Sequence, residues 1–143
     1  MNSRVEIKKN ALQKLKDAEL LYKRGSYDNA YYLVGYVVEL ALKARICKNI
    51  DIDNLFMPNA KYLKLFKTHD FDVLLMYAGL SEKLENEKVL NVDFHENWSY
   101  ICAWKEDCRY NICGSKTQVD ALRLFNAIRH PTNGFLKWIK KYW

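Results

Sequence analysis

Residues 26–46 read SYDNAYYLVGYVVELALKARI and predict one long helix that is apolar on most of its surface. Ser26 follows Gly25 and is expected to cap the first turn, because a serine hydroxyl can accept a hydrogen bond from a free backbone N–H. Apolar residues recur at spacings of three and four, which is typical of a helix with a buried stripe. They are Ala30, Leu33, Val34, Val37, Leu40, Ala41 and Ala44. A helix of this composition belongs at the centre of a helical bundle.

Two charged side chains, Glu39 and Lys43, lie in the middle of this apolar segment. A buried charge needs a partner, and a glutamate four positions before a lysine is the favourable order for an ion pair along a helix. We therefore predict that Glu39 lies within hydrogen-bonding reach of Lys43, of Arg109 or of a tyrosine hydroxyl.

The remaining sequence also predicts helices, and it contains no pattern typical of a strand. Residues 4–24 place apolar side chains on one side of a helix, and Gly25 is expected to end that helix in the left-handed conformation. Because so little chain separates this helix from residues 26–46, we expect the two to form an antiparallel hairpin.

Turn and cap residues divide the rest of the chain into shorter elements. They are a loop at 49–59, short helices at 59–67, 70–78 (capped by Thr68) and 82–90, an aromatic-rich helix at 94–110, a long helix that begins at a capping box of Ser115 and Gln118, and a last helix at 135–142 beyond an interruption at Pro131 and Gly134. The sequence therefore predicts an all-α bundle of four to five main helices with short extra helices, in a single domain over residues 1–143.

The composition argues against several classes of protein. No apolar run approaches the roughly 20 residues that a membrane-spanning helix needs, and the first residues, MNSRVEIKKNALQKLKD, lack the apolar core of a secretory signal. We expect a cytoplasmic protein without membrane contact. The four cysteines (Cys47, Cys102, Cys108 and Cys113) form no C-x-x-C pair, so we expect reduced thiols, and neither a metal nor another cofactor.

Positive charge is concentrated towards the C-terminal end of the sequence. Residues 115–143 contain six basic residues and one acidic residue, whereas the charges of the first 114 residues nearly cancel. Cations interleaved with aromatic rings are typical of surfaces that bind polyanions. On this interpretation Lys137, Lys140 and Lys141 would contact nucleic acid. The alternative is that these lysines form only a solvated face, while the apolar residues between them pack inward.

Several phrases of the sequence resemble the HEPN family of small helical domains. They are YDNAYYLVGYVVELALKA (27–44), THDFDVLL (68–75), WKEDCRY (104–110), and ALRLFNAI with FLKWI near the end (121–128 and 135–139). The resemblance implies a bundle of four or five helices that usually dimerises. Many members of that family are metal-independent endoribonucleases of toxin–antitoxin and phage-defence systems, which use an Arg-x4-6-His motif. Others bind nucleotides or RNA, often beside a nucleotidyltransferase.

The ribonuclease motif has one candidate pair in this chain. Arg123 and His130 are separated by six residues, whereas Arg109 has no histidine within the seven residues that follow it. In a ribonuclease, His130 would move the proton of the 2′-OH and Arg123 would stabilise the charge that develops on the phosphate. The sequence departs from the family pattern at Leu124, which replaces a polar residue, and Pro131 directly follows the histidine.

A binding module is the other main hypothesis. Glu39, Lys43, Arg109, Tyr110 and Tyr36 would then line one cleft, with the arginine on a phosphate and the tyrosines against a base. The same charged residues would equally serve as a buried ion network that fixes helix register. We predict a nucleotide- or RNA-binding module of a bacterial toxin–antitoxin or phage-defence system. It would act as a homodimer or beside a nucleotidyltransferase or defence effector. A metal-independent endoribonuclease and a pure protein-interaction module are the alternatives, so the sequence does not settle whether the chain is an enzyme.

Overall fold

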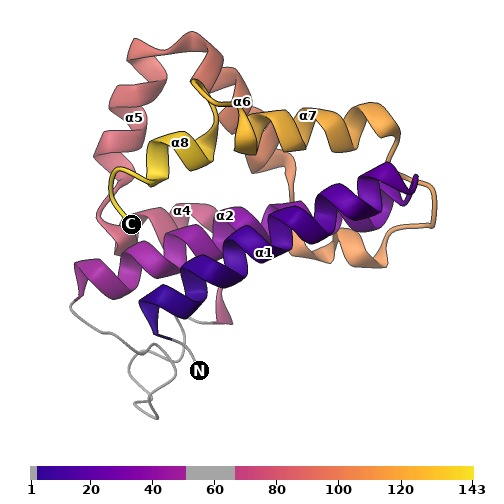
Figure 1. Cartoon of the computed structure of the whole chain (residues 1–143). Coiled ribbons are helices and arrows are strands. Elements are labelled where there is room, and N and C mark those ends of the chain that lie inside the picture. Colours follow the sequence, from indigo (N-terminus) through magenta and orange to yellow (C-terminus); the bar gives the residue numbers. More distant parts are fainter. Residues whose placement is uncertain (1–2, 51–66) are drawn as a thin grey trace.

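The computed structural model of this chain describes residues 3–50 and 67–143. All the regular elements in these two ranges are helices, which confirms the all-α prediction (Figure 1). They are α1 (Arg4–Lys23), α2 (Tyr27–Asn49), α4 (Phe71–Ala78), α5 (Ser81–Leu90), α6 (Val92–Ala103), the 3-10 helix η1 (Glu106–Tyr110), α7 (Gln118–Arg129) and α8 (Phe135–Ile139). The helix predicted at 59–67 lies, except for its last residue, outside the described ranges.

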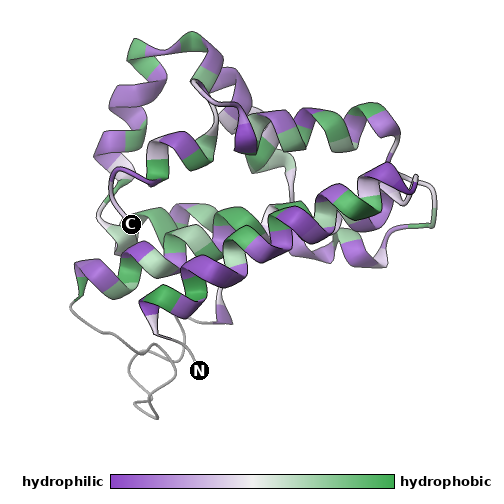
Figure 2. Ribbon diagram, in the orientation of Figure 1, coloured by the Kyte–Doolittle hydropathy of each residue, from purple (hydrophilic) through white to green (hydrophobic). Residues whose placement is uncertain are grey.

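The first two helices form the predicted antiparallel hairpin (Figure 1). Gly25 lies between them with a φ of +79°, a left-handed conformation that favours glycine. The predicted cap at Ser26 is wrong in detail, because its hydroxyl accepts a hydrogen bond from the Asn29 side chain at 3.0 Å and not from a backbone N–H. Figure 2 shows a larger share of hydrophobic residues in α2 than on the outer side of α1.

Helix α2 lies at the centre of the bundle, as its composition predicted. It packs against α1, α4, α7, α8 and η1, and its buried residues run from Ala30 to Cys47. At its far end, the Arg45 side chain donates hydrogen bonds to the carbonyls of Ala78 and Tyr142, at 3.1 and 2.9 Å. This arginine therefore ties α4 and the C-terminal segment to the central helix.

The aromatic helix predicted at 94–110 is wrong, because the structure divides it. Helix α6 ends at Ala103, Trp104 is extended, and η1 follows as a separate 3-10 helix. The Trp104 ring is only 1% exposed, and it stacks on Phe71 with ring centroids 5.6 Å apart. It also lies against Gly35, where an added Cβ would come within 2.1 Å of the ring. Leaving the helix lets the chain insert this tryptophan beside α2, at a point that only a glycine leaves open.

Two predicted caps are displaced by two residues. Asp70, and not Thr68, caps α4 by accepting hydrogen bonds from the backbone of Asp72 and Val73. The capping box of α7 consists of Thr117 and Asp120 and not of Ser115 and Gln118. In each case the residue closer to the apolar helix makes the bonds, because a cap must stand directly before the first helical turn.

The end of the chain follows the predicted break. Helix α7 stops at Arg129, a turn contains Pro131 and Gly134, and α8 begins at Phe135. Within the ranges 3–50 and 67–143, none of the helices combines the length and the apolar composition needed to cross a membrane.

Candidate functional site

The two charges in the middle of α2 pair with each other, as predicted. Lys43 Nζ lies 2.6 Å from Glu39 Oε1, and the two residues are only 7% and 3% exposed. An ion pair at this depth loses most of its hydration, so it needs further polar partners to be tolerated. Glu39 has a second partner on its other oxygen.

That second partner is His69, which connects the buried pair to the surface. His69 Nδ1 lies 2.7 Å from Glu39 Oε2, and His69 Nε2 lies 2.7 Å from Glu106 Oε2. Glu106 Oε2 is in turn 4.0 Å from Arg109 Nη1. The five side chains alternate in charge from the core outwards, and we call them the ion chain: Lys43, Glu39, His69, Glu106 and Arg109.

Both ring nitrogens of His69 face carboxylate oxygens. An ionised carboxylate only accepts hydrogen bonds, and a neutral imidazole has only one N–H to donate. A neutral His69 can therefore donate to only one of the two carboxylates, whereas the imidazolium form can donate to both.

The predicted binding residues are distributed between the core and the surface. Glu39 and Lys43 are buried, whereas Tyr110 is 76% exposed and the Arg109 guanidinium lies 4.8 Å from the centre of its ring. Tyr36 packs edge-on against Trp104 with ring centroids 5.3 Å apart. The ion chain links Arg109 to Glu39, but the structure does not place these residues on the walls of one cleft.

The tyrosines next to Arg109 belong to a hydrogen-bonded group. Tyr32 and Tyr36 place their hydroxyls 3.1 Å apart. Burial, followed by the hydrogen bond to Tyr32, raises the pKa of Tyr36. Hydrogen bonds to the side chains of Tyr32 and Tyr110 raise the pKa of Arg109 further above its already high value. Arg109 is therefore a permanent cation at the surface.

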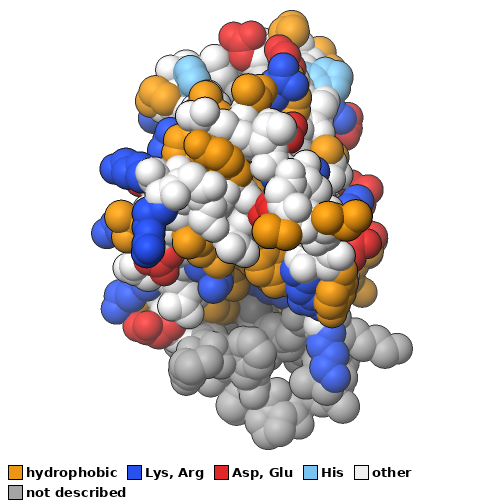
Figure 3. Space-filling model, turned by 90° about the vertical axis from the view of Figure 1, so that its right-hand side faces the viewer, with side chains coloured by type: hydrophobic (Ala, Val, Ile, Leu, Met, Phe, Trp, Pro, Cys, Tyr) orange, Lys and Arg blue, Asp and Glu red, His pale blue; other side chains and the backbone are white. Residues whose placement is uncertain are grey.

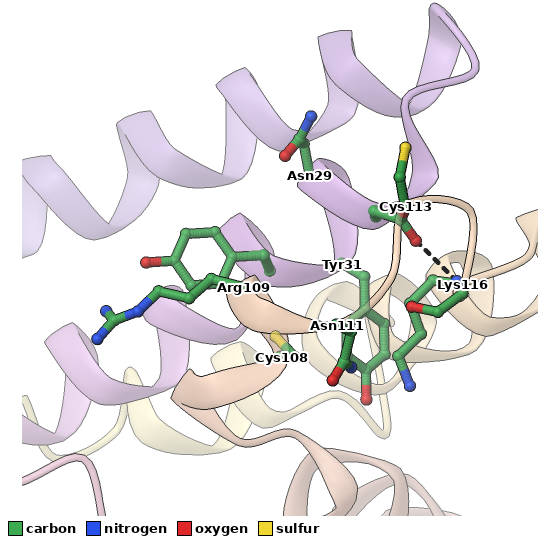
Figure 4. A pocket seen from close by; sticks show the side chains of 10 residues that line it. Asn29, Tyr31, Cys108, Arg109, Asn111, Cys113 and Lys116 are labelled. Atoms are coloured by element: carbon green, nitrogen blue, oxygen red, sulfur yellow. Dashed lines mark hydrogen bonds between the residues drawn. The ribbon is translucent and has the colours of Figure 1, made fainter.

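A hollow of about 260 Å³ adjoins this arginine (Figure 4), and we call it the Arg109 hollow. Its lining includes Arg109 and Lys116, which lie on opposite sides of Cys108 and Asn111 in Figure 4. The carboxylate of Asp28 accepts hydrogen bonds from the backbone N–H groups of Gly114 and Lys116. This aspartate anchors the loop before α7 to the start of α2, and its charge is directed at that loop.

A second hollow, of about 160 Å³, shares two lining residues with the first, and we call it the Arg123 hollow. Both hollows are lined by Tyr31 and Lys116. Lys116 Nζ lies 4.4 Å from the centre of the Tyr31 ring, and Arg123 Cζ lies 5.6 Å from that of Tyr100. At this end of the molecule, Lys and Arg side chains lie among hydrophobic ones, a class that includes tyrosine (Figure 3).

Arg109, Lys116 and Arg123 thus each lie over a tyrosine ring, and each of them lines one or both of these two hollows. We call these three cations the basic stripe. Asp120 also lines the Arg123 hollow, but its carboxylate accepts hydrogen bonds from Thr117, chiefly from the backbone N–H, and these lower its pKa. The stripe therefore carries an excess of positive charge beside aromatic rings.

Arg123 and His130 line a third hollow, of about 300 Å³, which we call the His130 hollow. Helix α7 ends before His130, whose Nδ1 accepts hydrogen bonds from the backbone N–H groups of Thr132 and Asn133 at 3.2 and 3.0 Å. The neutral imidazole consequently carries its hydrogen on Nε2 and can donate from that atom. Two acids, Asp93 and Glu96, also line this hollow.

Comparison with known proteins identifies the hairpin. Residues 5–52 match the HEPN domain family. The match covers α1 and α2, including Glu39 and Lys43 of the ion chain, and it confirms the resemblance predicted from the α2 phrase. It supports a nucleotide- or RNA-associated module in general terms. No curated protein and no solved structure matches the chain.

The C-terminal lysines lie outside the HEPN match and away from the basic stripe. Lys137, Lys140 and Lys141 are exposed, whereas the apolar residues between them, such as Trp138 and Ile139, are buried. This is the packing expected for a solvated face of α8. It leaves the three lysines accessible, on the side of the molecule away from the loop that precedes α7 (Figure 1).

Several residues of the candidate site could not be found from the sequence. His69 and Glu106 join Glu39 only because α4 and η1 pack on α2, and Lys116 meets Tyr31 only because Asp28 holds the loop. No local spacing connects these positions. The nearest signals were the phrases THDFDVLL and WKEDCRY, which contain His69 and Glu106.

Proposed function

We propose that this chain is a HEPN module that binds nucleotides or single-stranded RNA through the basic stripe. The observation that carries the proposal is the repetition of one arrangement, a cation over a tyrosine ring, along two hollows that share Tyr31 and Lys116. Arginine offers a planar fork for phosphate oxygens. Exposed aromatic rings such as Tyr110 offer stacking surfaces that accept any base.

A single strand suits this surface better than a duplex. Stacking on Tyr110 requires an unpaired base whose face is accessible, and sequence-tolerant single-strand binders combine such rings with a positively charged track. The three cations of the stripe supply such a track. Lys137, Lys140 and Lys141 would add long-range attraction for the polyanion without positioning it, because they are solvated and distant from the stripe.

A metal-independent endoribonuclease is the second candidate. The observation in its favour is that Arg123 and His130 line the same hollow, next to the stripe. Two features weigh against it. Because His130 Nδ1 accepts backbone hydrogen bonds, the neutral ring carries its hydrogen on Nε2, and that atom cannot accept a proton as a general base. The carboxylates of Asp93 and Glu96 in the same hollow would repel a phosphate. We therefore place binding before cleavage.

We further propose that the chain works as one HEPN-like domain, as a homodimer or with a partner protein such as a nucleotidyltransferase, in a toxin–antitoxin or phage-defence system. Its exposed apolar side chains support a protein contact, since Val89, Leu90 and Val92 are 82%, 83% and 76% exposed at the corner between α5 and α6. Light scattering that gives the 17.0 kDa mass of one chain at high micromolar concentration would contradict the homodimer.

The binding proposal is tested by fluorescence anisotropy with a 12-nucleotide single-stranded RNA. Arg109→Gln, Lys116→Gln and Arg123→Gln should each weaken binding, and the triple variant should flatten the dependence of log K on log salt by about two units, since each single-strand phosphate contact contributes roughly 0.7. Lys9→Gln, which removes the same charge at an exposed surface pair with Glu6, is the matched control. A triple variant that binds as tightly as this control would overturn the proposal.

A further inference from the structure

We infer that His69 regulates the phosphate site at Arg109 by holding the Glu106 carboxylate away from it. The inference rests on the proposed function, since it concerns how strongly the basic stripe binds. His69 touches no ligand in this scheme, so it acts as a positioning residue.

Glu106 has two cations within reach, and it favours one of them. Its Oε2 lies 2.7 Å from His69 Nε2 but 4.0 Å from Arg109 Nη1. The three side chains are partly exposed, at 30–41%, so small rotations can exchange these partners. While His69 holds the carboxylate, the guanidinium remains available to a phosphate. If the carboxylate turned to Arg109, it would occupy the same donors and neutralise the charge.

The charge of His69 decides which partner Glu106 takes. As the imidazolium, His69 donates to Glu39 from Nδ1 and to Glu106 from Nε2. When His69 loses one proton, the remaining hydrogen stays on Nδ1, which faces Glu39. The Glu39 carboxylate is buried and paired with Lys43, so it cannot rotate away from this donor. Nε2 then presents a lone pair to the Glu106 carboxylate. Two acceptors repel each other, and Arg109 Nη1, 4.0 Å from Glu106 Oε2, is an alternative donor.

The other charged groups around His69 do not offer Glu106 a stronger alternative than the exchange of His69 for Arg109. The charged and titratable groups that face it are Glu39, Lys43 and Tyr36 from α2, Glu106 and Arg109 from η1, and Lys67, Asp70, Lys105 and Asp107 around a hollow of about 420 Å³ that His69 also lines. Tyr36 stays neutral, because burial raises its pKa. The last four are exposed residues, so solvent screens their charges. Asp70 is also bound to the backbone of α4.

The test measures RNA binding between pH 5.5 and 8.5, the range in which histidine changes its charge. The probe is a 12-nucleotide RNA without terminal phosphates, because a phosphomonoester titrates near pH 6 and would add its own dependence. For the natural sequence, we expect affinity to fall by about threefold as pH rises, the size of an exposed ion pair that forms at Arg109.

Two variants separate the mechanism from a general effect of pH. Glu106→Gln removes the competing charge from a partly exposed position, and it should bind at least as tightly as the natural sequence at low pH, with no loss at high pH. His69→Gln should bind weakly and equally at all pH values. His95→Gln is the matched control, because that histidine is exposed on α6, and His130→Gln tests the histidine near Arg123. Both should retain the dependence.

The outcomes distinguish the inference from the proposed function. Absence of RNA binding at every pH would overturn both. Two outcomes would overturn the inference and leave the proposed function standing. One is an RNA affinity of the natural sequence that does not change with pH, and the other is a Glu106→Gln variant that keeps the pH dependence. Thermal unfolding of each variant, followed by circular dichroism, verifies the fold. Glu106→Gln is the deciding variant, because it removes no buried group and should fold normally.

Discussion

The imidazole Nδ1 of His69 lies 2.7 Å from the buried Glu39 carboxylate, although the two residues are 30 positions apart in the sequence. This contact and the pair with Lys43 together give both oxygens of the Glu39 carboxylate a partner, which a buried carboxylate needs. It also fixes the segment before α4, and through Glu106 the 3-10 helix η1, against α2. A charge inside the central helix α2 thereby positions elements that carry the candidate binding residues.

Removal of this carboxylate should destabilise the protein strongly. Glu39→Ala leaves the buried ammonium of Lys43 without its carboxylate, and loss of one member of a buried pair costs about 3–5 kcal/mol. Urea unfolding followed by circular dichroism measures the change in the free energy of unfolding. The control, Glu6→Ala, breaks an exposed pair with Lys9 and should cost less than about 1 kcal/mol. A loss below about 0.5 kcal/mol in Glu39→Ala would mean that the carboxylate is solvated.

Gly35→Ala should also destabilise, although alanine favours a helix over glycine by about 1 kcal/mol. The added Cβ would lie 2.1 Å from the buried Trp104 ring, which has no space to move. We expect a net cost of about 2 kcal/mol from overpacking. The double variant Gly35→Ala/Trp104→Ala should remove the clash, so the two single costs should not add. Additive costs would show that the two residues do not interact.

The cysteines should react with iodoacetamide in an order set by burial. Burial raises the pKa of the Cys102 and Cys108 thiols, so little thiolate forms at pH 8. Cys113 is exposed and should be alkylated first, whereas Cys47 is buried and should react only on unfolding. Mass spectrometry of peptides after timed quenching measures the order. Faster labelling of Cys108 than of Cys113 would contradict the described packing of η1.

Stability should fall in acid through the cap of α7. Hydrogen bonds from Thr117 lower the pKa of Asp120 below its ordinary value of 3.8. A carboxyl with a lowered folded-state pKa stabilises the protein above its unfolded-state pKa, and the contribution disappears as pH falls through the folded-state pKa. Asp120→Asn should therefore lose stability at pH 5 and show a flatter dependence below about pH 4. Asp17→Asn should keep the original slope, because this carboxylate accepts a hydrogen bond from the Gln13 side chain within α1 and caps no helix.

The purified protein should cleave RNA little, and His130→Ala should leave RNA binding intact. The assay is gel electrophoresis of labelled RNA in the presence of EDTA, at protein concentrations that saturate binding. Robust cleavage that disappears in both Arg123→Ala and His130→Ala would favour the ribonuclease instead. Lys116→Gln controls for weakened binding, because it should retain any cleavage once the RNA is saturated.

The hairpin of α1 and α2 and the pair of Glu39 with Lys43 followed from the sequence, because apolar periodicity and a spacing of four residues are local properties of a helix. The break at Trp104 did not follow from the sequence, because its cause lies on another helix, where Gly35 leaves room for the tryptophan ring. The cap of α7 was misplaced by two residues for a local reason, because the first turn of the helix begins at Gln118.

The candidate site depended on tertiary packing to a greater degree. The ion chain and the basic stripe contain contacts between residues tens of positions apart. The contacts of His69 and Lys116 exist because α4, η1 and the loop before α7 lie against α2, and that of Arg123 with Tyr100 exists because α7 packs on α6. The WKEDCRY phrase and the Arg-x4-6-His spacing identified Arg109 and Arg123 as candidates, whereas His69 and Lys116 acquired their partners from the fold. Charge and hydropathy patterns specify which face of a helix is buried, but the identity of the neighbour on that face depends on how the helices cross.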